Sequence, residues 1–299
     1  MMRITGHTLG TPHCNVPEAL ELFRSIGLDG AEVIYQNDYR SGLPVGDLAA
    51  VKSARQTADQ LDLPILGLTP YTTAHNSLNN QEWTAAVDEL RGAIEAAELL
   101  GAKVIRIYAG SWHPGDEDFE GHWAQLTKAL SVLASEAADA GATLCVENHF
   151  GTMTQTAAAT ARLVREVGHE AVRVLYDQAN LTFTHDEDFE QAFQVQGDLI
   201  SHVHVKDLVF TDPDAPFRAA ETARVQASER AVKSRVVGEG SLPWTDIVGE
   251  LAKRGYDGLL SLEYEYRWHP QDLPEPREGL ARSLEHLKTL INKQTEAQR

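Results

Sequence analysis

Cysteine is scarce in this sequence, with only Cys14 and Cys145 among 299 residues. Two cysteines cannot form a disulfide framework, which excludes the disulfide-rich secreted class and fits a reducing compartment. Cys145 lies in the apolar run TLCVE, so we expect a buried free thiol there. We therefore expect a cytoplasmic protein.

Long apolar runs are also missing. No stretch reaches the roughly 18 consecutive apolar residues that a transmembrane helix needs. The first ten residues, MMRITGHTLG, lack the apolar core of a signal peptide. We expect neither a membrane partner nor a secretory signal.

Positive charge is in short supply. Lys and Arg number 26 against 44 Asp and Glu, which gives a net charge of -18. An acidic protein repels a phosphate backbone, so nucleic acid is excluded as a partner. The acidic residues are spread along the chain, which is typical of a soluble surface and not of an acidic tail.

Short apolar, β-branched runs alternate with longer amphipathic runs throughout the chain. This alternation predicts a parallel α/β fold. The eight expected strands are residues 3–9, 31–35, 64–68, 103–108, 143–148, 172–177, 201–206 and 258–264. Eight strand–helix repeats predict closure into a (β/α)8 TIM barrel, with residues 1–299 as a single domain.

One segment is too long to be a plain connection. Residues 207–241, after the seventh expected strand, are the longest irregular stretch of the chain. Long loops in compact domains are usually functional. We expect this loop to lie over the catalytic face, as a cover or as a docking surface for a second subunit.

Four consecutive strands of the expected barrel end in residues of metal-ligand type. These residues are Glu147, Asp177, His204 and Glu263. A carboxylate inside an apolar strand is unfavourable unless it is paired or metal-bound, and active sites of such barrels lie at the C-terminal ends of the strands. Three carboxylates and one imidazole predict one divalent ion, with Mn²⁺ expected first and Mg²⁺ or Co²⁺ as alternatives.

Other polar residues near these strand ends have two readings each. Glu32 is either a supporting acid or a substrate contact, and His202 either a core or supporting histidine or a substrate contact. Lys206 forms an internal ion pair or touches the substrate. Trp112 is a platform for a sugar ring or packs on its own barrel.

Several motifs together resemble one superfamily over nearly the whole chain. They are ENH at 147–149, YDQANL at 176–181, HVHVKD at 202–207, GEGSLPW at 238–244 and YDGLLSLE at 256–263. They look like the sugar phosphate isomerase/epimerase superfamily, the xylose isomerase-like barrels. This group includes ketose 3-epimerases, hydroxypyruvate isomerase, inosose dehydratase, 3-dehydroshikimate dehydratase and endonuclease IV-type DNA repair enzymes. The resemblance implies the same four metal ligands as the strand ends.

The chain departs from the ketose 3-epimerases at two positions that help hold the ketose. Asn180 stands where they commonly have histidine, and Phe210 where they have arginine. In contrast, Glu-x-His at Glu147 and His149 resembles the dehydratases and the C-glycoside deglycosidase catalytic subunits, where the histidine is read as the base. We therefore assign His149 as the base and keep Asn180 as a substrate contact. The alternative for His149 is that it turns away and bonds a loop carbonyl beyond the strand end.

These features predict an enzyme that removes a proton α to a carbonyl of a sugar or sugar-like polyol and forms an enediolate. β-Elimination, by a dehydratase or a 3-oxo-glycoside or C-glycoside lyase, is favoured. The alternative is a ketose 3-epimerase or a hydroxypyruvate-type isomerase, with Glu147 and Glu263 as the acid–base pair. An abasic-DNA hydrolase would need more metals and histidines, and a non-catalytic binding barrel is the remaining class. We expect a small carbohydrate as substrate and a homo-oligomer, with a small accessory subunit as an option.

Overall fold

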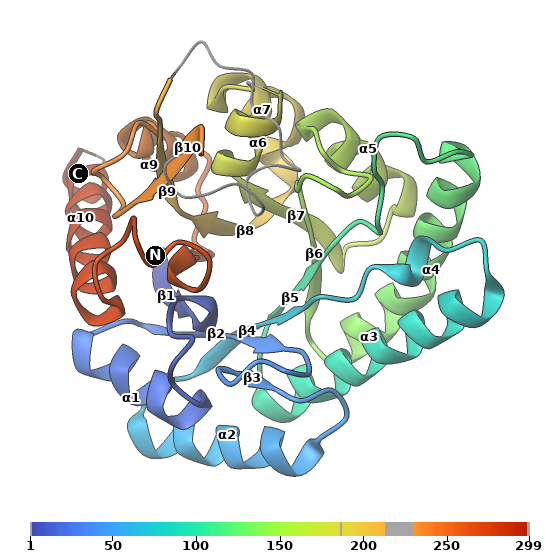
Figure 1. Cartoon of the computed structure of the whole chain (residues 1–299), viewed down its shortest axis with the longest axis horizontal. Helices are drawn as coiled ribbons and strands as arrows, with labels where there is room; N and C mark the ends of the chain where they lie inside the picture. Colours follow the sequence, from blue (N-terminus) through green and yellow to red (C-terminus); the bar gives the residue numbers. More distant parts are fainter. Residues whose placement is uncertain (1, 186, 213–229, 298–299) are drawn as a thin grey trace.

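The computed structural model describes residues 2–185, 187–212 and 230–297, in which strands and helices alternate as the sequence predicts (Figure 1). The barrel strands are β1 (Arg3–His7), β2 (Gly30–Tyr35), β4 (Ile65–Pro70), β5 (Val104–Ile107), β6 (Thr143–Glu147), β7 (Val172–Asp177), β8 (Ile200–Val205) and β11 (Leu259–Leu262). The α-helices in these ranges are α1 (Val16–Ile26), α2 (Leu48–Leu61), α3 (Asn80–Leu100), α4 (Phe119–Asp139), α5 (Ala157–Val167), α6 (Gln178–His185), α7 (Phe189–Gln196), α9 (Trp244–Lys253) and α10 (Pro276–Ala297).

The eight barrel strands run parallel and close on themselves. Their order is β1-β2-β4-β5-β6-β7-β8-β11, and β11 pairs with β1 through Ile4 and Leu260. A two-residue strand, β3 (Gly42–Leu43), adds to β2 outside the barrel. Parallel strands covered by helices are buried on both faces, which explains why they are apolar almost throughout. The predicted single-domain (β/α)8 barrel is confirmed.

The helices of the outer ring begin and end at residues suited to those positions. Asn15 and Glu18 form a reciprocal capping box at the start of α1. Gly27 ends α1 in the left-handed region, with φ of 85°, which favours glycine. Among the described residues, no helix combines the length and the apolar character that crossing a membrane requires.

Alternation along the strands creates layers inside the barrel. Toward the N-terminal ends, an apolar cluster fills the interior with Leu66, Val104, Cys145, Leu175 and Leu259. Two residues further along their strands come Arg106, Glu147 and Asp177, which therefore face the same interior. Cys145 is a fully buried free thiol, as the sequence predicts.

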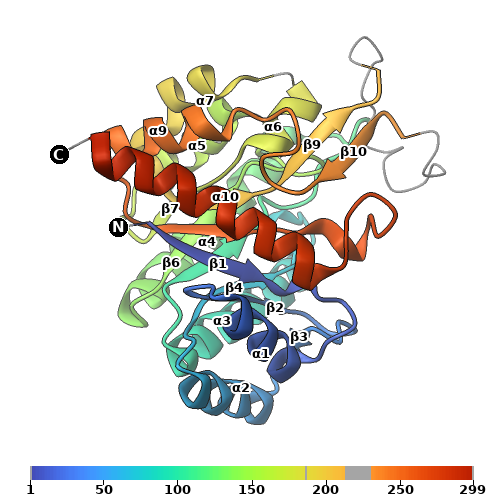
Figure 2. The same ribbon diagram turned by 90° about the vertical axis from the view of Figure 1, so that its left-hand side faces the viewer.

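The long segment after β8 is more regular than its sequence suggests. Strands β9 (Asp207–Phe210) and β10 (Val232–Arg235) pair antiparallel, because the apolar run at 208–210 continues the strand conformation beyond the barrel. This ribbon stands on the side to which the β1 arrow points (Figure 2). Residues 213–229 lie outside the described part, and the role of the segment as a cover or docking surface stays a prediction.

Candidate metal and active site

Four buried side chains from neighbouring strands converge at the C-terminal end of the barrel. Glu147 ends β6, Asp177 ends β7, His204 lies in β8, and Glu263 follows β11 directly. One ligand atom from each lies within 4.8 Å of the others. These are the four residues that the sequence predicts as metal ligands, and barrel closure brings all of them together.

The donor set fits a divalent cation. His204 Nδ1 lies 3.5 Å from Glu147 Oε1 and 3.5 Å from Glu263 Oε2. This buried nitrogen makes no hydrogen bond within the described residues. A ring nitrogen between carboxylate oxygens is an arrangement that a cation would complete, and three carboxylates with one imidazole suit Mn²⁺, Mg²⁺ or Co²⁺.

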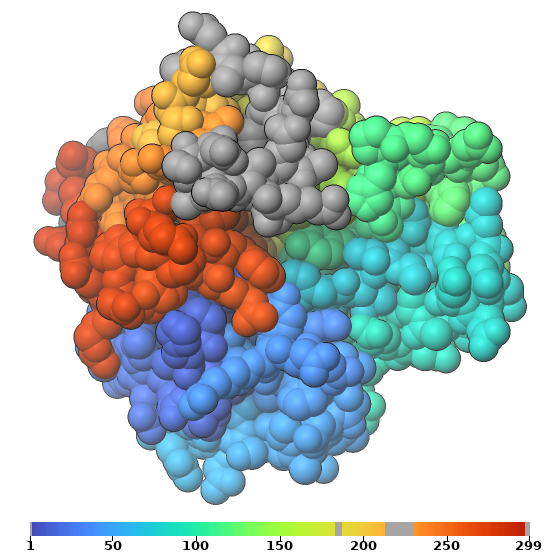
Figure 3. Space-filling model, viewed as in Figure 1, coloured from blue at the N-terminus to red at the C-terminus, as the bar shows by residue number. Residues whose placement is uncertain are grey.

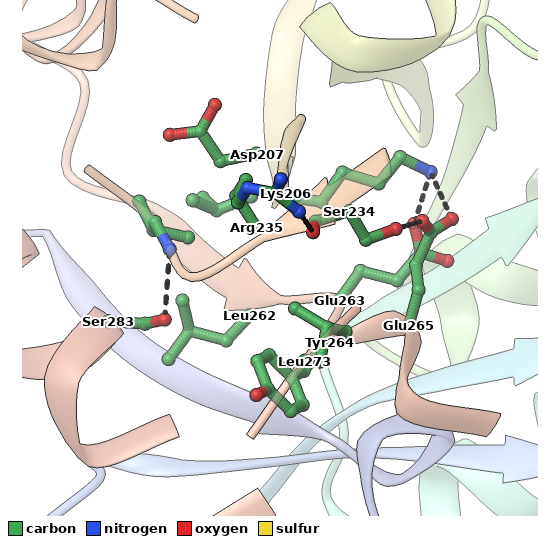
Figure 4. A pocket seen from close by; sticks show the side chains of 12 residues that line it. Lys206, Asp207, Ser234, Arg235, Leu262, Glu263, Tyr264, Glu265, Leu273 and Ser283 are labelled. Carbon is green, nitrogen blue, oxygen red and sulfur yellow. Dashed lines mark hydrogen bonds and ion pairs between the residues drawn. The ribbon is translucent and has the colours of Figure 1, made fainter. Parts of the chain in front are cut away.

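Lys206 reaches the same carboxylates. Its Nζ lies 2.8 Å from Glu263 Oε2 and 3.6 Å from Glu265 Oε1 (Figure 4). The same atom lies 2.9 Å from Asp177 Oδ2. Burial opposes the charge, but Asp177 and Glu263 raise the pKa of Lys206 well above its usual range. The internal ion pair considered from the sequence is present, and the contact of Lys206 with a substrate stays a prediction.

The surroundings of Glu147 and Asp177 shift the pKa values of these two carboxylates in opposite directions. Burial is the largest influence on Glu147 and opposes ionisation, but the facing His204 ring and the nearby cations lower the pKa of Glu147 to about 2. Burial raises the pKa of Asp177 to about 7, although Lys206 opposes this. Glu147 is therefore a fixed anion, whereas the charge on Asp177 depends on a neighbouring cation.

Glu32 and His202 lie deeper than the cluster. Both are fully buried, and His202 Nε2 lies 2.9 Å from Glu32 Oε2. Glu32 also contacts the Nε2 atom of His204 at 3.2 and 3.3 Å. Of the two readings that the sequence allows, these contacts favour the supporting one.

Asn180 braces two of the predicted ligands. Its Nδ2 donates to Glu147 Oε1 at 3.2 Å, and its backbone N–H donates to Asp177 Oδ1 at 3.1 Å. Asn148 strengthens the same junction by donating to the Asp177 carbonyl at 2.7 Å. Asn180 therefore holds the carboxylates apart and in place, whatever further contact it makes with a substrate.

His149 lies beyond the end of β6, beside the cluster. Its Nδ1 donates to the Phe150 carbonyl at 2.6 Å, and its ring packs against Tyr108 with centroids 4.7 Å apart. Burial lowers the pKa of His149, although Glu147 opposes this. The loop-carbonyl bond that the sequence allows as an alternative is therefore present. It occupies Nδ1 alone, so Nε2 of the neutral ring holds the lone pair that a base needs, and the role of His149 as base stays a prediction.

Arg106 is a buried residue of the site that sequence reasoning missed. Its Nη1 lies 3.4 Å from Glu147 Oε2, and its guanidinium stacks 3.6 Å from the Tyr108 ring centroid and 4.4 Å from that of Tyr71. The signal was present, because an arginine interrupts the apolar strand VIRI just as the acids interrupt theirs. Arg106 balances the charge of Glu147 and fixes two tyrosines at the rim.

Aromatic side chains continue along this rim. Tyr39 stacks on Tyr71 at 5.4 Å, and the Arg267 guanidinium lies 4.2 Å from the Tyr39 ring. Trp268 beside it is 51% exposed. On the face shown in Figure 3, the C-terminal segment (orange-red) accordingly meets the first third of the chain (blue).

Trp112 packs on its own barrel. Its ring contacts Phe119 at 5.1 Å and His122 at 5.8 Å, both near the start of α4. Its backbone N–H donates to the Gly151 carbonyl at 2.9 Å. These contacts favour the packing role over the sugar platform, which stays a prediction.

Comparison with known proteins agrees with this geometry. Over 168 residues the chain is 27% identical to the inosose dehydratase of Clostridium botulinum, a match that covers 56% of this chain and 54% of that enzyme. The chain thus spans about half the length of the curated relatives it matches.

Two solved structures share the fold. The E. coli 3-keto-D-glucoside 4-epimerase has a TM-score of 0.74 at 19% identity, over 97% of this chain and 100% of that one. The probable 3-DHS dehydratase of Bacillus anthracis has a TM-score of 0.75 at 17% identity, over 96% and 99%. The family model of xylose isomerase-like TIM barrels matches residues 20–290. With a closed barrel and this match over most of its length, the chain belongs to the xylose isomerase-like TIM barrel family.

Proposed function

We propose that the protein is a divalent-metal-dependent enzyme that removes a proton α to a carbonyl of a sugar-like polyol and then eliminates a β-substituent. The observation that carries the proposal is the convergence of Glu147, Asp177, His204 and Glu263 within 4.8 Å. Similarity to inosose dehydratases supports dehydration of a polyol ketone as the reaction class. We propose Mn²⁺ as the ion, with Mg²⁺ and Co²⁺ as alternatives.

A bound ion would polarise the carbonyl and stabilise the negative charge of the enediolate. His149 Nε2 accepts the α-proton, because the Phe150 carbonyl holds the proton of Nδ1. The electron pair of the broken C–H bond forms the enediolate double bond. In the second step the carbonyl re-forms, the enediolate electron pair becomes the new bond between the α- and β-carbons, and the β-carbon–oxygen bond breaks. The β-hydroxyl leaves as water with a proton, for which the Lys206 ammonium beside Glu263 is a suitable donor.

A second candidate is epimerisation or isomerisation of a ketose. Glu147 Oε1 and Glu263 Oε2 both face His204 Nδ1, each at 3.5 Å, so both carboxylates border the space where a substrate would meet the site. Two carboxylates on opposite faces of an enediolate can remove and return a proton. In this alternative, His149 only makes a hydrogen bond to the substrate, which its Nε2 accepts because Nδ1 donates to the Phe150 carbonyl.

The experiment that separates these reactions is proton NMR in D₂O with polyol ketones, 3-oxo-glycosides and ketoses, on protein of known metal content. We expect deuterium at the α-carbon of the recovered substrate together with an unsaturated product. Deuterated ketose epimers without elimination would establish the alternative. The absence of α-proton exchange with every substrate class would contradict both.

Substitution of the predicted ligands tests the site itself. Glu147→Gln, Asp177→Asn, His204→Ala and Glu263→Gln should each lower metal content or turnover by orders of magnitude. Glu285→Gln is the control, because Glu285 is an exposed carboxylate in α10 and is not part of the cluster. Full activity in excess EDTA would contradict the metal assignment.

Assembly and location are part of the proposal. We propose a homo-oligomer in the cytoplasm, with a small accessory subunit as an option. The segment 207–241 serves either as a cover over the catalytic face or as the surface for a second subunit. Both cysteines are free thiols, which fits a reducing compartment. Light scattering of the purified protein measures the mass, and a monomer at micromolar concentration would contradict the assembly.

A further inference from the structure

We propose that a hydrogen-bond relay from the Leu9 backbone through His7, Thr69 and Glu32 positions His204, so that its Nδ1 faces the other predicted metal ligands. These are positioning residues, and the inference rests on the proposed metal site. The relay is built from strands β1, β4, β2 and β8, and it ends at the single imidazole of the cluster.

The first half of the relay has only one possible direction. The Leu9 backbone N–H lies 3.0 Å from His7 Nδ1, and a backbone N–H can only donate. His7 Nδ1 is therefore an acceptor, and the ring proton is on Nε2. His7 Nε2 donates to Thr69 Oγ1 at 2.9 Å, so the Thr69 hydroxyl proton must point elsewhere.

In the second half of the relay, the same order of donors and acceptors continues from Thr69 to His204. Thr69 Oγ1 donates to Glu32 Oε1 at 2.9 Å. Glu32, which also accepts from His202 Nε2 at 2.9 Å, then accepts from His204 Nε2 at 3.2 Å. With Nε2 donating to Glu32, Nδ1 is the ring atom of His204 that is left for the cluster, 3.5 Å from Glu147 Oε1.

Packing leaves the relay little freedom. His7, Thr69, Glu32 and His204 are all 0% exposed. The His204 ring stands edge-on to that of His7, with centroids 5.6 Å apart at 81°. Gly67 makes room for Glu32, since a Cβ atom there would lie 3.2 Å from Glu32 Cγ. His7, Glu32 and His204 could be taken for a second metal site, but their facing atoms already bond one another or Thr69.

The test removes one hydroxyl group and measures metal binding. Thr69→Val keeps the shape of the side chain and breaks both relay bonds, whereas Thr69→Ser keeps the hydroxyl. Thr5→Val is the matched control, because buried Thr5 Oγ1 in β1 has no hydrogen-bond partner within the described residues. The readouts are the Mn²⁺ dissociation constant by calorimetry and the visible absorption bands of the Co²⁺-loaded protein, which report ligand geometry.

We expect Thr69→Val to raise the Mn²⁺ dissociation constant about 10-fold or more and to shift the Co²⁺ bands. For Thr69→Ser and Thr5→Val, the Mn²⁺ dissociation constant should stay within about threefold of the wild-type value, because neither substitution removes a hydrogen bond of the relay. If Thr69→Val does not fold, Glu32→Gln is measured instead, and we expect an equal or larger loss of Mn²⁺ affinity. Unchanged metal binding in Thr69→Val, or an equal loss in Thr5→Val, overturns the relay alone. Wild-type protein that binds no Mn²⁺, Mg²⁺ or Co²⁺ overturns the proposed metal centre and the relay with it.

Discussion

At the residue scale, Glu147 and His149 lie at the same strand end, but their side chains make contacts with different groups. Glu147 contacts Arg106, Asn180 and His204 and is part of the predicted metal site. His149 is held by its bond to the Phe150 carbonyl and by ring packing. Substitution at His149 should therefore leave the cluster intact, which makes it the best position for separating chemistry from metal binding.

His149→Ala should keep the metal content and the fold but lose α-proton exchange by orders of magnitude, because the variant lacks the base that accepts the proton. Exchange in D₂O is followed by proton NMR at saturating substrate. His149→Ala with a raised KM but exchange at the wild-type rate would return the acid–base role to Glu147 and Glu263.

At the element scale, one buried carboxylate holds the β9–β10 insertion on the barrel. Asp207 Oδ1 accepts from the backbone N–H groups of Leu208 and Leu242 at 2.9 and 3.2 Å. Its Oδ2 accepts from those of Gly238 and Gly240 at 2.9 and 3.1 Å. The motif GEGSLPW is therefore folded around Asp207, and a Cβ at position 240 would lie 2.0 Å from Asp207 Oδ1.

Asp207→Ala should destabilise the protein by about 1–3 kcal/mol, since the buried N–H groups of Leu208 and Leu242 lose their acceptor. Hydrogen exchange should increase most at residues 236–242. Urea unfolding and exchange mass spectrometry measure both effects. Asp246→Asn, an exposed acid in α9, is the control, and equal effects of the two substitutions would contradict this explanation.

The tip of the insertion is predicted to serve substrate use or assembly. Deleting residues 213–224 should lower kcat/KM or the mass in solution, while the melting temperature changes little, because Asp207 still holds the base of the ribbon. Steady-state kinetics, light scattering and thermal unfolding of one preparation provide the comparison. Unchanged kinetics together with unchanged mass would rule this role out.

At the scale of the whole molecule, a buried neutral histidine links stability to pH. His75 is fully buried and donates from Nε2 to the Tyr108 carbonyl at 2.9 Å. Burial lowers the pKa of His75 to about 4, although this hydrogen bond opposes the shift. An unfolded histidine titrates near 6.5, so between about pH 6.5 and pH 4 the unfolded state binds more protons and stability falls with falling pH.

His75→Gln should remove this dependence, since the amide can donate to the same carbonyl but does not titrate in this range. Between pH 7 and pH 4, wild type should lose up to about 3 kcal/mol more unfolding free energy than the variant. Urea titrations of both proteins at several pH values measure the difference. Parallel pH dependence of the two proteins would show that His75 is not responsible.

The sequence by itself determined the barrel, the order of its strands along the chain and the four residues of the candidate metal site. Glu147, Asp177, His204 and Glu263 were identifiable because each stands at or near the end of an apolar strand. Parallel strands in a closed barrel present their ends on one side, so local pattern and overall topology lead to the same answer.

Tertiary structure alone decided which side chains support that site. Glu32 meets His202 and His204 across about 170 positions of sequence, at a point where the register between β2 and β4 shifts. Thr69 looks like any strand threonine until β4 lies beside β2. Such contacts depend on barrel closure and side-chain rotamers, which hydrophobic periodicity does not encode. The ligands therefore follow from the strand pattern, whereas their orientation follows from packing between strands that are distant in sequence.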